Sequence, residues 1–389
     1  MFLFICLFYF LLSAAESAEV KCSEDELSPL QNSLKEAQRK SARITALLEK
    51  VHNLGETKQR KVAAILGAVV ADAAARPLHW VYDNKALLKY IEQVWETPEF
   101  IPENKSPFYK LPTGENSCYW DVTEASLTAL ANSESREYDY KGMCEILVSF
   151  FGPENTKGYD AGAFQEFKKK VQAKNIKSPY DGRYFHEAVT NFLEAYKNDE
   201  TQKPYGAAKM RSTEGFCLNL PLALMYSDSQ NFDKISSEVI QTMTTWKTAT
   251  QLAITASKIV AHLVESPSYN ILSVRDEIAE YPKAVRSIDE IRYAISKKWD
   301  HSKAVIQEFG PACNNPSSFQ GAVHATVTSN SYTEAVRKTI RAGGCNCSRA
   351  LFIGAMCGAK YGMEGIPRDW IERTYNAEKV LSLALKVYS

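Results

Sequence analysis

Apolar residues recur at helical spacing along most of this chain, and strict alternation of apolar and polar residues is nearly absent. A helix places positions i, i+3 and i+4 on one face, so this pattern predicts an all-α protein. Helices are predicted at 121–134, 139–151, 161–173, 184–196, 213–226, 232–243, 247–264, 284–297, 319–328, 332–341, 348–360 and 367–385. Residues 96–117 are rich in Pro, Asn, Gly and Ser and predict a loop. The prolines at 311–316 and 366–368 separate helices rather than domains.

Glycines mark one of these helices, near the end of the chain. Gly354, Gly358 and Gly362 recur every fourth residue and so share a helical face. Each glycine costs a helix roughly 1 kcal/mol, so the stripe predicts that another backbone packs close against it. Gly343 and Gly344 predict a tight turn before the helix. Free N–H groups and the positive dipole end meet at such a start, which suits a site. A capped core helix is the alternative.

The N-terminal region shows two different patterns. Residues 1–12 are apolar but too few to span a bilayer, and Ser13, Ala14 and Ala15 follow them. We interpret residues 1–17 as a cleaved signal peptide and expect a secreted or lumenal protein, with an uncleaved anchor or a wrong start codon as alternatives. Residues 18–60 hold an amphipathic leading helix, packed on the body or forming a short coiled-coil seam. Residues 61–389 then form a single domain, and we expect no membrane association after cleavage.

Composition excludes one class of function. The chain has 389 residues, 45% of them hydrophobic and 24% charged, as expected for a globular protein. Its 46 basic and 46 acidic residues give a formal net charge of 0, without a basic run. Nucleic-acid binding is therefore not expected, because it depends on a basic surface that neutralises phosphates.

Four segments place polar residues beside small ones, and we take these as candidates for chemistry. They span residues 67–80, 117–125, 204–212 and 343–362. An aspartate among alanines in a helix needs a buried partner or a polar cleft, and Asp72 is such a residue. An aspartate at the start of a helix, such as Asp121, either caps that helix or takes part in a site.

Together these segments resemble the ADP-ribosylglycohydrolase family, and within it the branch of jellyfish J-crystallins and selenoprotein J. The shared stretches are Ala-Asp-Ala…Pro-Leu-His-Trp at 71–80, Cys-Tyr-x-Asp at 118–121, Met-Arg at 210–211, Phe-Gly-x-Ala-Cys-x-x-Pro-x-Ser-Phe at 309–319 and Gly-Gly-x-Asn-Cys-Ser-Arg at 343–349. Each stretch is weak by itself, but the set is specific and covers roughly residues 61–389. The resemblance implies an all-α, single-domain orthogonal helical bundle.

The resemblance also implies two magnesium ions in a cleft. The family holds them with a Thr-Asp-Asp segment, an Asp-x-Asp-Thr segment in a Gly-Gly loop, and an acid that follows a Gly-Asp-Ala segment. These positions fall here on Trp120, Asp121 and Val122, on residues 345–348, and on His79. Asp121 is the one acid that remains of five. Magnesium prefers hard oxygen ligands, so its site would be largely lost.

Three interpretations of the replacements stay open. Asp121, Cys345 and Cys347, with His79, supply the ligand types of a zinc or copper(I) site. The two cysteines could equally be inert remnants of a lost magnesium site. Alternatively, the pKa of a thiol at a helix start is lowered, and Cys345 with His79 would then resemble a nucleophile and its base.

The chain has nine cysteines, and their spacing does not indicate a disulfide framework. We expect no bond between Cys345 and Cys347, because side chains two residues apart at a helix start point roughly 200° apart around its axis. These thiols should be free, metal-bound or paired elsewhere, for example with Cys118 or Cys313.

The sequence therefore predicts a secreted ADP-ribosylglycohydrolase-like protein with a cleft for an ADP-ribose-like small molecule. If it is an enzyme, it hydrolyses a ribosyl glycosidic bond. Asp121 would hold a metal or water, and His79 would be the acid/base, because a free imidazole titrates near neutrality. Arg211 could contact a ligand phosphate or form an internal salt bridge. The other predicted ligand contacts are Asp72, Tyr119, Trp120, Gly343, Gly344, Asn346 and Ser348. Tyr119 and Trp120 could instead be core residues. The alternative is a non-catalytic structural or binding protein of the crystallin kind.

Overall fold

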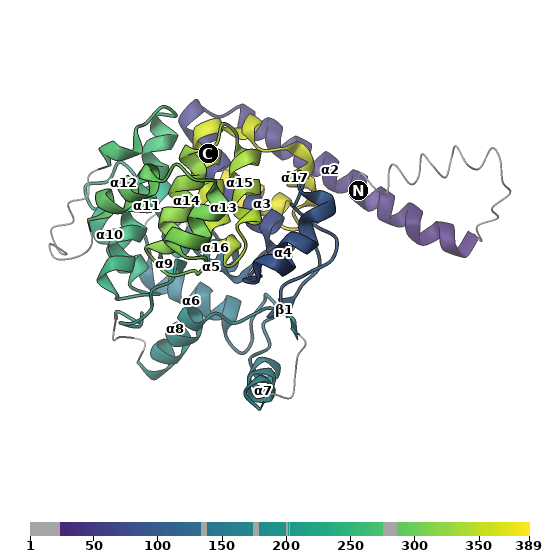
Figure 1. The fold of residues 1–389 in the computed structure, drawn as a ribbon, viewed down its shortest axis with the longest axis horizontal. Coiled ribbons are helices and arrows are strands. Elements are labelled where there is room, and N and C mark those ends of the chain that lie inside the picture. Colours follow the sequence, from purple (N-terminus) through teal and green to yellow (C-terminus); the bar gives the residue numbers. More distant parts are fainter. Residues whose placement is uncertain (1–23, 134–137, 174–178, 200, 202, 275–285) are drawn as a thin grey trace.

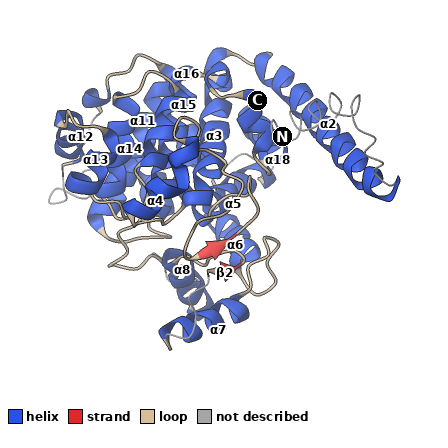
Figure 2. Ribbon diagram, turned by 45° about the vertical axis from the view of Figure 1, so that its right-hand side comes forward, coloured by secondary structure: helices blue, strands red, loops and turns tan. Residues whose placement is uncertain are grey.

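Helices make up nearly all of the regular structure in this protein (Figure 1). The structure is a computed structural model, and it describes residues 24–133, 138–173, 179–199, 201, 203–274 and 286–389. Two short strands, β1 (Tyr109–Lys110) and β2 (Tyr180–Asp181), pair in parallel within this part of the chain (Figure 2). The predicted all-α class is confirmed.

The described helices vary widely in length. They are α2 (Glu24–His52), α3 (Glu56–Ala75), α4 (Asn84–Ile91), α5 (Cys118–Asn132), α6 (Tyr140–Phe151), α7 (Ala161–Gln172), α8 (Glu187–Asn198), α9 (Glu214–Met225), α10 (Phe232–Ile240), α11 (Lys247–Glu265), α12 (Ser287–Ser296), α13 (His301–Ala304), α14 (Ser317–Val327), α15 (Tyr332–Arg341), α16 (Asn346–Tyr361), α17 (Arg368–Arg373) and α18 (Ala377–Tyr388). The helix predicted at 367–385 is in fact two helices, α17 and α18, and neither α4 nor α13 was predicted.

The long helix α2 is the first element of the described residues, and its first half extends away from the body (Figure 1). Its second half packs on the body, where Ile44 and Val51 are fully buried. The Lys40 Nζ donates to the carbonyl oxygen of Thr374, 2.8 Å away, which fixes α2 against the segment before α18. The predicted signal peptide, residues 1–17, lies outside the described residues. The helices that are described are all too short or too polar to cross a membrane.

Helices α3 and α16 pack backbone to backbone at the centre of the protein. A Cβ added to Gly354 would lie 2.7 Å from the carbonyl carbon of Gly67, and one added to Gly358 would lie 2.8 Å from that of Ala63. These contacts confirm the close approach that the glycine stripe predicts. Gly362 has a different role: it ends α16 with a φ of 69°, and a Cβ there would meet nothing within 4 Å. The packing of α3 on α16 brings the end of α3 beside the start of α16.

Candidate functional site

The start of α16 is held by a glycine turn and a buried arginine. Gly343 and Gly344 have φ values of 65° and 59°, the left-handed region that glycine adopts without strain. The Arg349 Nη2 donates to the carbonyl oxygen of Gly343, and its Nε donates to Thr339 Oγ1 at 2.9 Å. Burial lowers the pKa of the Arg349 guanidinium to about 10. The arginine therefore fixes the turn from inside the protein.

This turn places Cys345 in a cage of polar and aromatic side chains. The Trp80 Nε1 donates to the Cys345 Sγ at 3.2 Å, and the Tyr119 hydroxyl lies 3.2 Å from the same sulfur. The His79 Nε2 lies 3.4 Å from it, and the His79 Nδ1 lies 2.8 Å from the Tyr109 hydroxyl. Since an indole N–H is only a donor, the sulfur must accept that hydrogen bond. The cage therefore favours a negatively charged sulfur.

A second thiol, that of Cys313, reaches Cys345 from the segment before α14. Burial opposes ionisation of Cys345, but a hydrogen bond with Cys313 and the charge of His79 outweigh it, and the pKa of Cys345 lies well below its ordinary value. The same hydrogen bond, together with burial, raises the pKa of Cys313. The amide of Cys345 donates to the carbonyl oxygen of Pro311 at 2.7 Å, so the two segments are joined through their backbones as well.

The polar contacts extend from the cage toward α9. The Tyr119 hydroxyl lies 3.5 Å from the His186 Nε2, and the His186 Nδ1 forms an ion pair with the Glu214 carboxylate. Burial lowers the pKa of His186, but the charge and hydrogen bond of Glu214 outweigh it and raise this pKa above its ordinary value. A connected line of polar groups therefore runs from Glu214 to Cys345.

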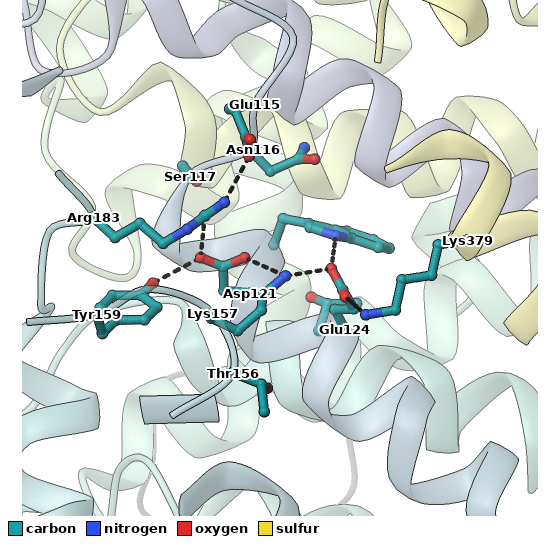
Figure 3. A network of polar contacts seen from close by, with 12 residues as sticks. Glu115, Asn116, Ser117, Asp121, Glu124, Thr156, Lys157, Tyr159, Arg183 and Lys379 are labelled. Carbon is teal, nitrogen blue, oxygen red and sulfur yellow. Dashed lines mark hydrogen bonds and ion pairs between the residues drawn. The ribbon is translucent and has the colours of Figure 1, made fainter. Parts of the chain in front are cut away.

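Asp121 belongs to a different network, built from ion pairs (Figure 3). Its Oδ2 accepts from the Arg183 Nη1 at 2.9 Å and from the Tyr159 hydroxyl at 2.7 Å. Its Oδ1 lies 3.2 Å from the Lys157 Nζ. Burial raises the pKa of Asp121, but Lys157 and Arg183 outweigh burial and hold this pKa below its ordinary value. The carboxylate is therefore charged and neutralised by the chain itself.

Glu124, one turn further along α5, completes this network (Figure 3). Its carboxylate accepts from the Lys157 Nζ at 2.8 Å and from the Lys379 Nζ at 2.7 Å. The Trp120 Nε1 donates to the same carboxylate at 3.0 Å. Arg183 also pairs with Glu115, at 2.6 Å. Each buried charge in this network thus has a partner of the opposite sign, as buried charges require.

The buried carboxylate of Asp72, in α3, has the polar partners that the sequence predicts. Its carboxylate accepts from the Ser117 hydroxyl at 2.5 Å, from the Ser117 amide at 2.8 Å and from the Asn116 side chain at 2.9 Å. Burial raises the pKa of Asp72, against the effect of these hydrogen bonds. Ser117 caps α5 by accepting from the Tyr119 amide at 3.2 Å. Asp72 thus fixes the start of α5, and Asp121 is not the cap of that helix.

Other residues of the predicted site form hydrogen bonds with the protein's own backbone instead of facing a ligand. The Asn346 Nδ2 donates to the carbonyl oxygen of Ala75 at 3.1 Å, and the Ser348 hydroxyl donates to that of Cys345 at 2.9 Å. The Cys347 Sγ lies 3.8 Å from the carbonyl oxygen of Asp72. These three side chains join the start of α16 to its surroundings.

Arg211 lies outside both networks, as an exposed residue. Its guanidinium stacks over the Trp246 ring, 4.9 Å from the centroid.

Of the predicted catalytic and metal-binding residues, the structure brings His79 and Cys345 into contact, while Asp121 and Cys347 contact other groups. In the part of the chain that the structure describes, no three His, Cys, Asp or Glu side chains are grouped so that they could hold a metal ion. Every cysteine described is free, including Cys345 and Cys347, so these two form no bond with each other in this structure.

The predicted site is closed to solvent in this structure. His79, Asp121 and Cys345 each have a relative exposure of 0%. The cavity bounded in part by Ser348 has a volume of about 10 Å³, which is no larger than the space that one water needs. Larger cavities of about 270 and 720 Å³ lie beside α6 and between α2 and α17, and neither is lined by these three residues.

Sequence reasoning missed most residues that complete these networks, among them Lys157, Arg183, His186 and Glu214, and it missed the role of Cys313 beside Cys345. Cys313 could have been identified from the sequence, because it lies in the segment 309–319, one of those that resemble the family. Lys157 and Arg183 stand in connections between helices, where no periodic pattern indicates which way a side chain points.

Comparisons with known proteins agree with the helical fold. A family model described as ADP-ribosylglycohydrolase matches residues 54–389. Crystallin J1A of Tripedalia cystophora is 29% identical over 339 residues, which cover 85% of this chain and 96% of that protein. Crystallin J1B of the same organism is 27% identical over 338 residues, 85% and 97% of the two chains.

A solved structure shows the same fold. It is titled "ADP-ribosylglycohydrolase-related protein complex", and it matches with a TM-score of 0.56 and 16% identity over 86% of this chain and 99% of that chain. At this identity the likeness concerns the fold alone. The resemblance drawn from the motifs is confirmed, because the family model covers most of the sequence. This chain belongs to the ADP-ribosylglycohydrolase family.

Proposed function

We propose that this protein is a non-hydrolytic member of the ADP-ribosylglycohydrolase family, in which internal ion pairs have taken the place of the magnesium site. The observation that carries the proposal is the environment of Asp121. Lys157 and Arg183 already neutralise this carboxylate, which is fully buried. A magnesium ion would have to displace two cations of the chain and find further hard ligands.

The residues at the other implied metal positions do not suit magnesium. Cys345 and Cys347 offer sulfur, which selects softer metals, and His79 is occupied by Tyr109 and Cys345. Trp120 donates to Glu124 and cannot be a ligand. We therefore derive no magnesium-dependent step for this chain.

The role that remains is that of a structural or binding protein. The curated relatives with 29% and 27% identity are called crystallins, and they match over almost their whole length. The complete burial of His79, Asp121 and Cys345 supports the same reading, because a substrate cannot contact these three side chains in this structure. An ADP-ribose-like ligand and secretion remain parts of the proposal that need their own tests.

The main test is a titration of the purified full chain with magnesium, together with an assay for hydrolysis. We expect isothermal titration calorimetry to show no saturable heat with MgCl₂. We also expect no release of ADP-ribose from modified arginine or serine above the protein-free blank, with an active hydrolase of the family as the positive control. Magnesium-stimulated release that Asp121→Asn abolishes would overturn the proposal.

Two further measurements address ligand and location. Titration with ADP-ribose alone, without metal, tests the predicted ligand, and saturable binding would favour a binding role over a purely structural one. N-terminal sequencing of protein from the culture medium of expressing cells tests secretion. A mature start near Glu16 or Ala18 is expected, whereas an intact Met1 on protein found only inside the cells would exclude cleavage and secretion.

A further inference from the structure

We propose that Cys313 and Cys345 form a reversible disulfide when a small hydroperoxide oxidises the protein. This site is a redox modification site on the protein's own thiols. It goes beyond the proposed function and does not depend on it, since it uses neither a metal nor a ligand of the family.

Proximity is the first argument. The amide of Cys345 donates to the carbonyl oxygen of Pro311 at 2.7 Å, and a Cβ added to Gly344 would lie 2.6 Å from the Pro311 Cβ. The segment that contains Cys313 therefore runs directly against the start of α16. Cys313 follows Pro311 by two residues, so it lies on the segment that contacts Cys345, and each thiol affects the pKa of the other. A disulfide needs close backbones, and the contact between Cys345 and Pro311 brings the two segments that close.

The surroundings of Cys345 are the second argument. Three groups, on Trp80, Tyr119 and His79, lie within 3.4 Å of its sulfur. Hydrogen bonds to a sulfur stabilise the thiolate, which is the form that attacks a peroxide. The low pKa of Cys345 agrees with this geometry. Cys345 is therefore the nucleophilic member of the pair.

Selectivity is the third argument, because the other described cysteines lack these features. Burial raises the pKa of Cys118, Cys217 and Cys347, so their thiols stay protonated. Cys345 is itself buried, but Cys313 is partly exposed and borders it. Because Cys345 has no exposed surface, the proposal requires an oxidant as small as hydrogen peroxide, which enters from the Cys313 side.

The chemistry balances with the peroxide as the oxidant. The Cys345 thiolate attacks one peroxide oxygen, the O–O bond breaks, and hydroxide leaves with the bonding electron pair, which gives a sulfenic acid. The Cys313 sulfur then attacks the Cys345 sulfur, the S–O bond breaks, and the Cys313 proton leaves with the hydroxyl group as water. Two thiols are oxidised by two electrons in all, and one peroxide is reduced to two waters. Added thiol reverses the bond by exchange.

The experiment uses the reduced full chain with hydrogen peroxide at a few molar equivalents. After alkylation of the remaining thiols, the protein is digested without reduction and analysed by mass spectrometry. We expect a cross-linked peptide pair that contains Cys313 and Cys345, 2 Da lighter than the sum of the reduced peptides by loss of two hydrogens. Dithiothreitol should remove this species completely.

Two variants make the result specific. Cys347→Ser changes a thiol at the same helix start and should leave the Cys313–Cys345 bond unchanged. Cys313→Ser should abolish the bond and leave Cys345 as a sulfenic acid that dimedone labels. Circular dichroism confirms that both variants are folded. The proposal is refuted if other cysteines are oxidised first, if the bond joins Cys345 to another residue, or if Cys345 is not labelled in Cys313→Ser.

Discussion

Replacing Asp121 by asparagine tests the ion-pair network directly, because the change removes one charge and almost no volume. The carboxylate is fully buried and faces Lys157 and Arg183, whose side chains are 9% and 12% exposed. Removing one partner of a buried pair costs about 3–5 kcal/mol, because a buried charge loses its counterion. Lys157 keeps Glu124 and Arg183 keeps Glu115, so we expect the low end of this range.

The measurement is urea unfolding at pH 7, followed by circular dichroism. We expect Asp121→Asn to lower the free energy of unfolding by about 3 kcal/mol with an unchanged m-value. Asp289→Asn is the matched control. That carboxylate lies near two arginines, Arg286 and Arg292, but its side chain is 53% exposed. Its loss should cost less than about 1 kcal/mol, as for exposed pairs.

The pH dependence gives a second readout of the same carboxylate. The pKa of Asp121 is lower in the folded protein than in the unfolded chain, where it is about 3.9. Its stabilising contribution is therefore complete above about pH 4 and is lost as the pH falls through the folded pKa. The gap between wild type and Asp121→Asn should stay constant from pH 7 to about pH 5 and narrow below about pH 4. A loss no larger than that of Asp289→Asn, or a gap that persists in acid, would refute the role of this network.

Three further predictions concern packing, a histidine and metal. Gly354→Ala should lower the free energy of unfolding by about 1–3 kcal/mol or more, because its Cβ would overlap the Gly67 backbone. Gly55→Ala is the control, and it should have little effect in the same urea assay because a Cβ there meets nothing within 4 Å. Glu214 raises the pKa of His186, so this pair stabilises the protein below about pH 6.5 and loses its effect as the pH rises through the folded pKa. Glu214→Gln should remove that dependence in thermal melts between pH 5 and 9, and an unchanged pH profile would count against the pair. EDTA and millimolar MgCl₂ should leave the melting temperature unchanged relative to matched ionic strength, and a rise with MgCl₂ alone would indicate a bound ion.

The sequence by itself determined most of the helices and the close contact at the centre of the protein. Helical spacing of apolar residues is a local property, so it predicts where a helix begins and ends, closely for α11 and α15, whereas α5 begins three residues before its predicted start. The glycines at 354 and 358 predicted a neighbouring backbone, since glycine in a helix is costly unless something packs against it. Asp72 predicted a buried partner for the same kind of reason, which is the cost of an unpaired buried charge.

The tertiary structure decided which groups meet. Lys157 and Arg183 stand in connections, and only the arrangement of α5, α6 and β2 brings them to Asp121. Cys313 and Cys345 lie 32 residues apart in number, and the backbone contact of Cys345 with Pro311 brings their segments together. A sequence pattern gives the type of a side chain, but the partner of a charge or thiol depends on distances between segments far apart in the chain. For that reason the residues that were predicted to form one site belong to three separate groups: the cage around Cys345, the ion pairs of Asp121, and the hydrogen bonds of Asp72 at the start of α5.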